Sequence, residues 1–462
     1  MRRDSRSSML RNPLRWLFSR QPVSRNRRRP APFRPFLEAF EDRAVPSVYH
    51  VTTNADSGAG SLRDAVDAAN KHVGADTIVF DTSLAGKTIM LTSGELVVTD
   101  DLSIDGLGAA KLRISGAASS RVFEIQAGAT TIAGLTISGG NALADNSNGT
   151  SAFDGVGGSI LNLSTLKLRN CALSDSTADG GGGGIFNFFA TLTVSDSGLS
   201  SNSAFGAGGV LNFGGALTIN GSSFSNNHAI GGTDGGAIIN SLGTVIVSGS
   251  TFSGNSADVL GGAFVNNDSM TITGSVLAGN SALGGGGLYN EGNLTVRSSI
   301  FSGNSANTGG GLLNSFGTAN ISDSILAGNS AIDYTAFGTV FHGAGGAISN
   351  DTSGTVTITN CILAGNSATG NGGGVNNVFG GSMIMTGCAL FGNSANGDGG
   401  GIFNAATLTV IGCILAGNSA SSDGGGIFNN GGTVNLGFSL LCMNTPDNIV
   451  GGFTDLGGNV LC

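Results

Sequence analysis

The sequence is short of charge, of proline and of cysteine, and each shortage excludes a class of protein. Charged residues make up 11% of the 462 residues, less than half of the ~25% that is usual. Seven prolines and a hydrophobic fraction of 40% argue against a disordered chain, which is normally charged and poor in aliphatic residues. Six cysteines are too few for a disulfide scaffold.

Long apolar runs are also missing. No segment approaches the ~18 consecutive apolar residues that span a membrane. The most apolar stretch near the N-terminus, residues 9–18, is interrupted by Arg11, Pro13 and Arg15, so it lacks the hydrophobic region of an ordinary signal peptide. The sequence therefore predicts no transmembrane segment and leaves the export route unassigned.

Basic residues are concentrated at the N-terminus. Residues 1–50 hold twelve arginines against four acidic residues, a balance of +8, which leaves −17 for the remainder because the whole chain carries −9. From residue 157 onward only Lys167, Arg169 and Arg297 are basic. We therefore expect no nucleic-acid binding by this part of the chain, which lacks a phosphate-binding surface. Residues 1–45 are interpreted as a disordered or targeting segment.

Glycine is abundant, at 80 residues, and its arrangement is repetitive. No G-X-Y period is present, which excludes collagen. Instead, the phrase GG-x-apolar-x-N recurs every 24 to 36 residues, followed by an alternating run such as TLTV and a phrase such as CILAGNSA. The asparagines of this phrase are Asn162, Asn187, Asn212, Asn240, Asn266, Asn290, Asn314, Asn350, Asn377, Asn404 and Asn429.

Each repeat contains three short apolar or alternating runs separated by turn residues, a pattern typical of three strands and three turns. One unit cannot bury its own apolar side, whereas stacked units can, each adding its strands to three long parallel sheets. The sequence predicts an all-β fold, a right-handed parallel β-helix (solenoid) of about 11 regular coils. We expect an N-terminal cap with irregular first coils in residues 46–156, regular repeats in 157–441 and a C-terminal cap in 442–462.

Stacking predicts where side chains lie. The apolar residue of each GG-x-apolar phrase points inward, and the recurring asparagines form ladders of amide hydrogen bonds between coils. Charge is scarce because like charges would stack ~4.8 Å apart. The segment SLRDAVDAAN at 61–70 predicts a short amphipathic helix, with Ser61 and Asp64 as a capping pair, that covers the open end of the first coil.

The repeat phrases resemble the polymorphic outer-membrane protein repeat family, whose hallmark is paired GGAI-like and FxxN-like tetrapeptides. GGAI stands at Gly235 and Gly345, and FSGN at Phe252 and Phe301. GSLRDAV at 60–66 is similar to the CSLREA-type motif that precedes such repeats, and LEAFEDRAVPS at 37–47 resembles an N-terminal sequence of large secreted planctomycete proteins. The resemblance, over about residues 60–462, implies a secreted or cell-surface β-helix with an adhesin-like role.

Catalysis would need acidic or basic groups at defined spacing. A glycosidase needs two carboxylates a defined distance apart, and a lyase of this fold, by resemblance, combines acidic calcium ligands with a basic proton acceptor. The repeats contain nearly isolated aspartates, one glutamate, Glu291, and three basic residues. Lys167 and Arg169 share one face of a strand, but no acidic pair stands at the matching position of the next coil. We interpret them as a solvated face and predict no catalytic residue.

One position could hold a metal ion. Asp398 and Asp423 precede equivalent GGG triplets in adjacent coils, and Asn371 has the same register one coil earlier. Stacked oxygens of this kind could bind calcium, although calcium prefers six or more oxygen ligands. We favour turn chemistry, since Asp and Asn are common just before glycine. No other cofactor is predicted.

The cysteines divide into two groups. Four of them occupy a position held by serine in other coils, where we expect inward-facing thiols: Cys171, Cys361, Cys388 and Cys413. Cys442 and Cys462 flank the irregular terminal segment and are the candidates for a disulfide that staples it. No histidine accompanies the thiols at metal-ligand spacing, so a zinc site is not expected.

Two coils carry insertions at the same corner, at 143–156 and 332–344. The second contains Tyr334, Phe337, Phe341 and His342. Insertions of a solenoid gather on its binding face, so these four residues are the candidate ligand contacts, toward a glycan or a protein. The alternative, which we favour, is a loop that folds its aromatics against the rod. We expect His342 to lack a nearby carboxylate or nucleophile, so no catalytic role is predicted for it.

The leading hypothesis is a non-enzymatic, secreted or cell-surface β-helix that acts as an adhesin or as an envelope structural module. The alternative is a degenerate polysaccharide lyase or hydrolase of the same fold. The two hypotheses differ on whether the protein turns over a polysaccharide.

Overall fold

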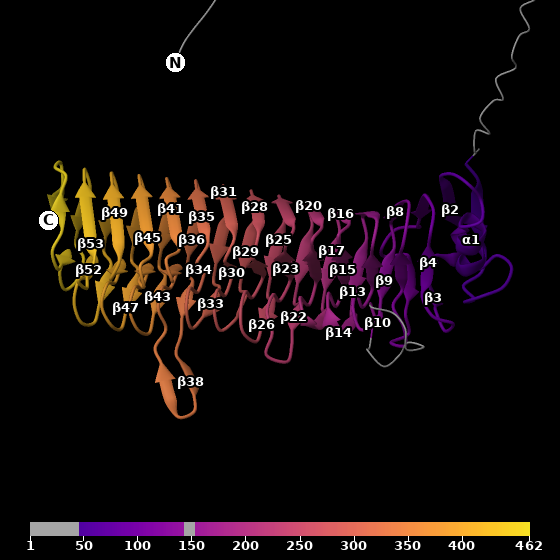
Figure 1. The fold of residues 1–462 in the computed structure, drawn as a ribbon, viewed down its shortest axis with the longest axis horizontal. Helices are drawn as coiled ribbons and strands as arrows, with labels where there is room; N and C mark the ends of the chain where they lie inside the picture. The colour runs from indigo at the N-terminus through magenta and orange to yellow at the C-terminus, as the bar shows by residue number, and fades with distance from the viewer. Residues whose placement is uncertain (1–45, 143–152) are drawn as a thin grey trace, which may run out of the picture. The chain divides into compact units, whose positions relative to one another are not determined.

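The computed structural model describes residues 46–142 and 153–462. The arginine-rich segment 1–45 lies outside the described residues, and so do residues 143–152, which belong to the first insertion. Within them, nearly every element is a short strand that pairs in parallel with a strand one coil away, and the coils stack side by side (Figure 1). The predicted right-handed parallel β-helix is confirmed.

One coil from the middle of the stack shows the plan. It consists of β30 (Leu288–Asn290), β31 (Asn293–Arg297), β32 (Ile300–Ser302) and the short β33 (Ser305–Ala306), and the next coil begins at β34 (Leu312–Ser315). β30 pairs with β34 without any register shift. The residues of one coil therefore lie directly beside their counterparts in the next.

Equivalent strands build three long sheets. Among the described residues, the first strand of each coil belongs to a 14-stranded sheet, the second to a 16-stranded sheet and the third to a 15-stranded sheet. Their first and last strands are, in that order, β4 (Leu96–Val98) and β55 (Ile449–Val450), β1 (Val48–Val51) and β56 (Thr454–Asp455), and β3 (Lys87–Met90) and β57 (Val460–Leu461).

The prediction of three strands per unit is incomplete, because many coils contain a short fourth strand. β33 pairs with β37 (Ser330–Ala331), and β43 (Ser367–Ala368) continues this five-stranded sheet toward the C-terminus. A second five-stranded sheet occupies the same corner in earlier coils. These strands are mostly two residues long, too short for an alternating pattern to show in sequence. In the later sheet each strand is a Ser-Ala pair that stays extended beside an identical pair one coil away.

The inward positions match the prediction. The apolar residue of every repeat phrase has no exposed surface. These residues are Ile160, Ile185, Val210, Ile238, Phe264, Leu288, Leu312, Ile348, Val375, Ile402 and Ile427. They belong to one apolar core that runs through the whole stack.

The asparagines of the repeat phrase form the predicted ladder along one corner of the stack. From Asn162 to Asn429, the side-chain Nδ2 of each asparagine donates to Oδ1 of the asparagine in the next coil at 2.6–3.0 Å. All eleven are buried. Each buried amide is therefore paired between coils, as a buried polar group requires.

A second ladder is built by the asparagines of the GNSA-type phrases, from Asn202 to Asn444. From Asn227 onward, Oδ1 of each asparagine accepts both the main-chain N–H and the side-chain Nδ2 of the asparagine one coil earlier, at 2.8–3.2 Å. The same side chains also donate to a carbonyl of the preceding third strand, as Asn304 does to Leu277 at 2.9 Å. This ladder therefore ties each turn to two other coil segments.

The second glycine of the repeat phrase is required by close backbone approach. At Gly310, a Cβ would lie 2.4 Å from the carbonyl oxygen of Ser330 and 2.5 Å from that of Gly346. Distances this short leave no room for a side chain. The glycine content is thus a consequence of how tightly successive corners stack.

The predicted helix is present at the N-terminal end of the stack (Figure 1). It is α1 (Leu62–Ala69), and its N-cap Ser61 accepts a hydrogen bond from the main chain of Asp64 at 3.2 Å. One face of α1 is buried in the core beside β1 and β2 (Asp76–Phe80). No helix among the described residues is long and apolar enough to cross a membrane.

The four serine-position cysteines face the core as predicted, and none forms a disulfide. The main-chain N–H of Cys388 donates to Sγ of Cys413 at 3.3 Å, and that of Ser324 donates to Sγ of Cys361 at 3.4 Å. The thiols thus replace the serine hydroxyls of other coils as hydrogen-bond acceptors. Burial raises the pKa of Cys361 to about 12, so that this thiol stays protonated.

Candidate functional site

The second insertion forms a β-hairpin that projects from the corner of the stack (Figure 1). Its strands β38 (Tyr334–Ala336) and β39 (Thr339–Phe341) pair antiparallel. Phe337 and Gly338, the two residues between them, both have positive φ, 51° and 75°. This is the backbone of a type I′ turn, whose twist matches the twist of a two-stranded hairpin.

The aromatics of the hairpin are exposed. Phe337 at the tip is 107% exposed, Phe341 50% and Tyr334 42%, with the Tyr334 and Phe341 ring centroids 6.5 Å apart. The favoured interpretation, that the loop folds its aromatics against the rod, is wrong for Phe337, whereas the half-exposed Tyr334 lines a hollow together with Leu283 of the rod. The reason is that antiparallel pairing satisfies the main-chain hydrogen bonds of the insertion within itself, so it can leave the rod at little cost.

The base of the hairpin is held by two polar side chains. Asn307 Nδ2, one coil earlier, donates to the carbonyl oxygens of Ile332 (2.9 Å) and Phe341 (2.8 Å) and so joins both hairpin arms. Asp333 lies 3.2 Å from His342 Nδ1, which corrects the expectation that His342 has no nearby carboxylate. The hydrogen bond from Thr369 lowers the pKa of Asp333.

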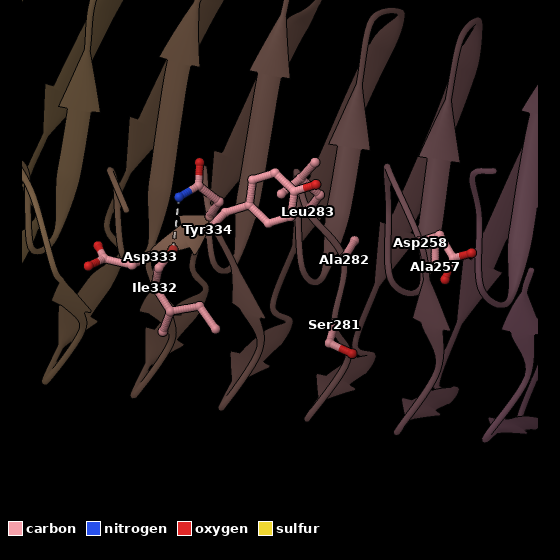
Figure 2. A pocket seen from close by; sticks show the side chains of 9 residues that line it. Ala257, Asp258, Ser281, Ala282, Leu283, Ile332, Asp333 and Tyr334 are labelled. Carbon is pink, nitrogen blue, oxygen red and sulfur yellow. Dashed lines mark hydrogen bonds between the residues drawn. The ribbon is translucent and has the colours of Figure 1, made fainter. Parts of the chain in front are cut away.

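Two hollows flank the hairpin. The first, the acidic hollow, encloses about 290 Å³ and is lined by Asp258, Ser281, Leu283, Asp333 and Tyr334, among others. Figure 2 shows Asp333 and Asp258 at opposite ends, with Tyr334 and Leu283 between them. The N–H of Gly232 lowers the pKa of Asp258, so both carboxylates favour their charged form.

The second hollow, the amide groove, lies on the C-terminal side of the hairpin and encloses about 500 Å³. Its lining includes His342 and the aromatic and amide side chains of Asn371, Asn376, Phe379, Asn396 and Phe403. No Asp, Glu, Lys or Arg of the described residues lines it. The hairpin thus separates an acidic hollow from a groove without formal charge apart from His342.

The calcium candidates come together but are engaged with the main chain. Asp398 N–H donates to Oδ1 of Asn371 at 2.9 Å, and Asp423 N–H donates to Oδ1 of Asp398 at 3.2 Å. Both bonds run between neighbouring coils, so Oδ1 of Asn371 and of Asp398 each accept from the main chain of the next coil. Within residues 46–142 and 153–462, no group of three or more His, Cys, Asp or Glu is arranged to hold a metal ion.

A carboxylate pair that sequence analysis missed lies in the irregular first coils. Arg121 Nη1 is 2.8 Å from Glu95 and 3.6 Å from Glu124. Burial raises the pKa of Glu95, and contact with Glu124 adds to this effect. The two carboxyl groups are in hydrogen-bonding contact, closer than the ~5–9.5 Å separation that glycoside hydrolysis uses. The first coils have no repeat period, so nothing in the sequence placed these residues side by side.

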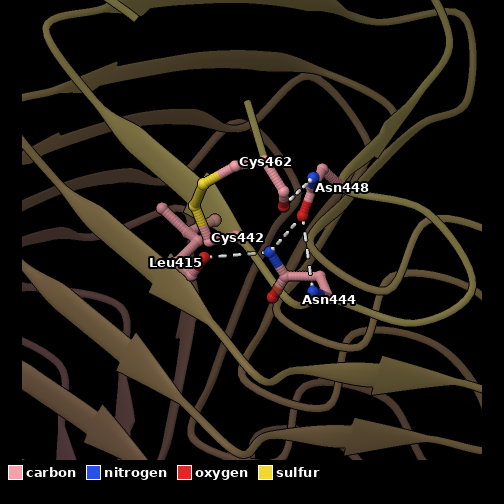
Figure 3. The surroundings of a disulfide bond; sticks show 5 residues. All are labelled: Leu415, Cys442, Asn444, Asn448 and Cys462. Carbon is pink, nitrogen blue, oxygen red and sulfur yellow. Dashed lines mark hydrogen bonds between the residues drawn. A yellow bond between two sulfur atoms is a disulfide. The ribbon is translucent and has the colours of Figure 1, made fainter. Parts of the chain in front are cut away.

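Cys442 and Cys462 are joined by a disulfide in the structure. Figure 3 shows it beside Asn448, whose Nδ2 donates to the carbonyl oxygen of Cys462 at 2.9 Å. Asn444, the last member of the second ladder, donates to Asn448 Oδ1 at 2.9 Å. The disulfide therefore holds the final coil at the end of the asparagine ladder.

Reduction of this disulfide is expected to destabilise the terminal coil by about 3 kcal/mol, because the closed loop spans 20 residues. Amides of β55–β57 should then exchange with solvent roughly a hundredfold faster, measured by hydrogen exchange with and without reductant. Cys413→Ser is the matched control, because serine occupies the equivalent position in other coils. It should leave the exchange of β55–β57 unchanged. Equal exchange rates in reduced and oxidised protein would contradict the prediction.

Comparisons with known proteins give similarity of fold alone. No protein-family model and no curated protein matches this sequence. The A-module of the mannuronan C-5 epimerase AlgE6 from Azotobacter vinelandii is 13% identical, covering 89% of this chain and 98% of its own, with a TM-score of 0.37. Tailspike protein 3 of bacteriophage CBA120 is 11% identical, covering 82% and 59%, with a TM-score of 0.46.

A third similar structure is PfbA, a surface adhesin of Streptococcus pneumoniae. It is 11% identical, covering 89% of this chain and 92% of its own, with a TM-score of 0.36. At these identities and TM-scores, the similarity transfers no activity, substrate or site residue to this chain.

Proposed function

We propose that this chain is a secreted or cell-surface β-helix of the polymorphic outer-membrane protein repeat type that acts as an adhesin-like or envelope binding module without catalysis. The observation that carries the proposal is the hairpin β38–β39, which presents Tyr334, Phe337 and Phe341 to solvent. Exposed aromatics on a rigid support are the side chains that contribute most to binding surfaces.

The framework supports this role. Two asparagine ladders and a continuous core hold the coils in register, and Asn307 and Asp333 fix the base of the hairpin to neighbouring coils. A contact element on a rigid scaffold loses little conformational entropy on binding. The ligand is a cell-surface glycan or a protein.

The alternative is a polysaccharide lyase or hydrolase. Such an enzyme needs acid and base groups that both reach the substrate. In the described residues, Glu95 and Glu124 contact each other and Arg121 rather than facing across a substrate-sized gap. The arrangement favours a structural role for this cluster.

Replacing Tyr334, Phe337 and Phe341 together by alanine is expected to weaken binding to target cells or to a glycan array by about thirtyfold, the loss of ~2 kcal/mol typical of aromatic contact residues. Phe438→Ala is the matched control, because its ring is 69% exposed at the corner after β53 (Thr433–Gly437). Circular dichroism should show both variants folded.

Two outcomes would contradict the proposal. One is binding that is unchanged in the triple variant. The other is release of new reducing ends or unsaturated products from a polysaccharide panel, provided that Glu95→Gln abolishes it. The second result would support the enzyme instead.

A further inference from the structure

We propose that the amide groove binds an uncharged polysaccharide chain. The inference rests on the proposed function and gives its ligand class. It is carried by three properties of the groove: the exposed ring of Phe379, free side-chain amides, and the absence of Asp, Glu, Lys and Arg from its lining.

One exposed ring, that of Phe379, provides a flat apolar surface in the groove, and the buried Phe403 lies beneath the lining. Phe403 is the central residue of β48 (Ile402–Asn404) and is 6% exposed, with its ring stacked 5.7 Å from that of Phe428 at an interplanar angle of 20°. This stack fixes the orientation of the Phe403 ring. Phe379, at the corner after β44 (Val375–Asn377), is 76% exposed. The C–H face of a pyranose packs on an exposed ring such as that of Phe379 without needing charge.

The amides provide hydrogen bonds of both kinds. Asn376 donates to Ser349 Oγ at 3.1 Å, and Asn371 Oδ1 accepts from the main chain of Asp398 at 2.9 Å. Within the described residues, no protein group binds Asn376 Oδ1, Asn371 Nδ2 or the side-chain amide of Asn396. An amide offers two donors and one acceptor oxygen, which complement the hydroxyl groups of a sugar.

The amides also follow the direction of the stack. Asn371 and Asn396 lie on neighbouring coils, which are linked by the hydrogen bond from Gly397 N to Gly370 O at 2.9 Å. Neighbouring strands are ~4.8 Å apart, close to the length of one sugar residue in an extended chain. A polysaccharide laid along the groove therefore meets an amide on each of two successive coils.

Charge distinguishes the ligand class. The chain beyond residue 50 carries a net charge of −17, and the hollow on the other side of the hairpin contains Asp258 and Asp333. An acidic polysaccharide would be repelled by this field and would find no cation in the groove except His342, which is paired with Asp333. An uncharged polysaccharide is not repelled by this field and needs no cation in the groove.

The test is isothermal titration of the full-length protein with oligosaccharide fragments of an uncharged β-glucan, a mannan and a xylan, and with polygalacturonate fragments for comparison. We expect at least one uncharged fragment to bind with an affinity that does not fall with added salt. Polygalacturonate, which the arginines of residues 1–50 attract, should show only binding that is lost with added salt and is unchanged in Phe379→Ala. Phe379→Ala and Asn396→Ala should each weaken binding of the uncharged fragment by about tenfold.

Phe316→Ala is the matched control for Phe379→Ala. Phe316 occupies the equivalent corner of an earlier coil, is 66% exposed and also has a positive φ, 61° against 50° for Phe379, but does not line the groove. The Phe316→Ala variant should bind the uncharged fragments as tightly as the unmodified protein does. Both substitutions impose the same backbone requirement, so a difference between them reports the ring.

Three results would overturn the proposal: no binding of any uncharged fragment, polygalacturonate binding that Phe379→Ala weakens, or equal affinity of an uncharged fragment in Phe379→Ala and Phe316→Ala. The triple alanine variant of Tyr334, Phe337 and Phe341 distinguishes a failure of the groove proposal from a failure of the proposed function. If cell binding depends on the hairpin aromatics but no uncharged fragment binds in the titration, the groove proposal alone is overturned. If no variant loses cell binding and no variant loses oligosaccharide binding, both the proposed function and the groove proposal are overturned.

Discussion

Asn304→Ala is expected to lower the free energy of unfolding by about 3–5 kcal/mol. Asn304 is fully buried. Its Oδ1 accepts from the main chain and the side chain of Asn280 (3.0 and 2.9 Å), and its Nδ2 donates to Leu277 O and Asn329 Oδ1 (both 2.9 Å). Alanine removes all four hydrogen bonds and leaves the Asn280 N–H buried without its acceptor, which costs more than the loss of an exposed bond.

Guanidinium chloride unfolding of the full chain measures this change, and hydrogen exchange locates it. Because each coil contacts only its neighbours, faster exchange should be concentrated in the coils on either side of Asn304. Asn293→Ala is the matched control: Asn293 begins β31 and is exposed, so its replacement should change stability by less than ~0.5 kcal/mol. A loss below about 1 kcal/mol in Asn304→Ala would show that the ladder contributes little.

Phe252→Ala is expected to cost about 3–5 kcal/mol, the range for truncating a buried phenylalanine. Phe252 has no exposed surface, and its ring centroid lies 4.8 Å from that of Phe224 and 4.3 Å from that of Phe264. Removing the ring leaves a cavity between two rings on fixed strands, which cannot close without breaking register.

The same unfolding experiment tests the second prediction. Phe337→Ala is its control, since Phe337 is fully exposed at the hairpin tip and its loss creates no cavity. A Phe252→Ala protein as stable as Phe337→Ala would mean that the core relaxes around the deletion.

Much of the fold could be predicted because the repeat places identical residues in register. A period near 25 residues puts Asn266 beside Asn290, and Phe264 beside Leu288. Once the strands are parallel and in register, the inward positions and both asparagine ladders follow. The helix α1 was predictable for a different reason: its capping and apolar face are local features of ten residues.

The candidate site could be predicted only in part. The insertion was visible as an interruption of the period, and its aromatics were visible by composition. Whether Tyr334 and Phe341 face the rod or solvent depends on the pairing of β38 with β39, a pairing that no repeat specifies.

The sequence by itself determined the solenoid, its register, its capping helix and the poverty of charge that stacking demands. Only the tertiary structure decided the exposure of the hairpin, the contact between Asp333 and His342, and the grouping of Phe379, Asn396 and Phe403 into one groove. The physical reason is that a repeating position packs against the equivalent residue of the next coil, whereas these contacts join positions that do not repeat. Their geometry depends on how neighbouring corners stack in space.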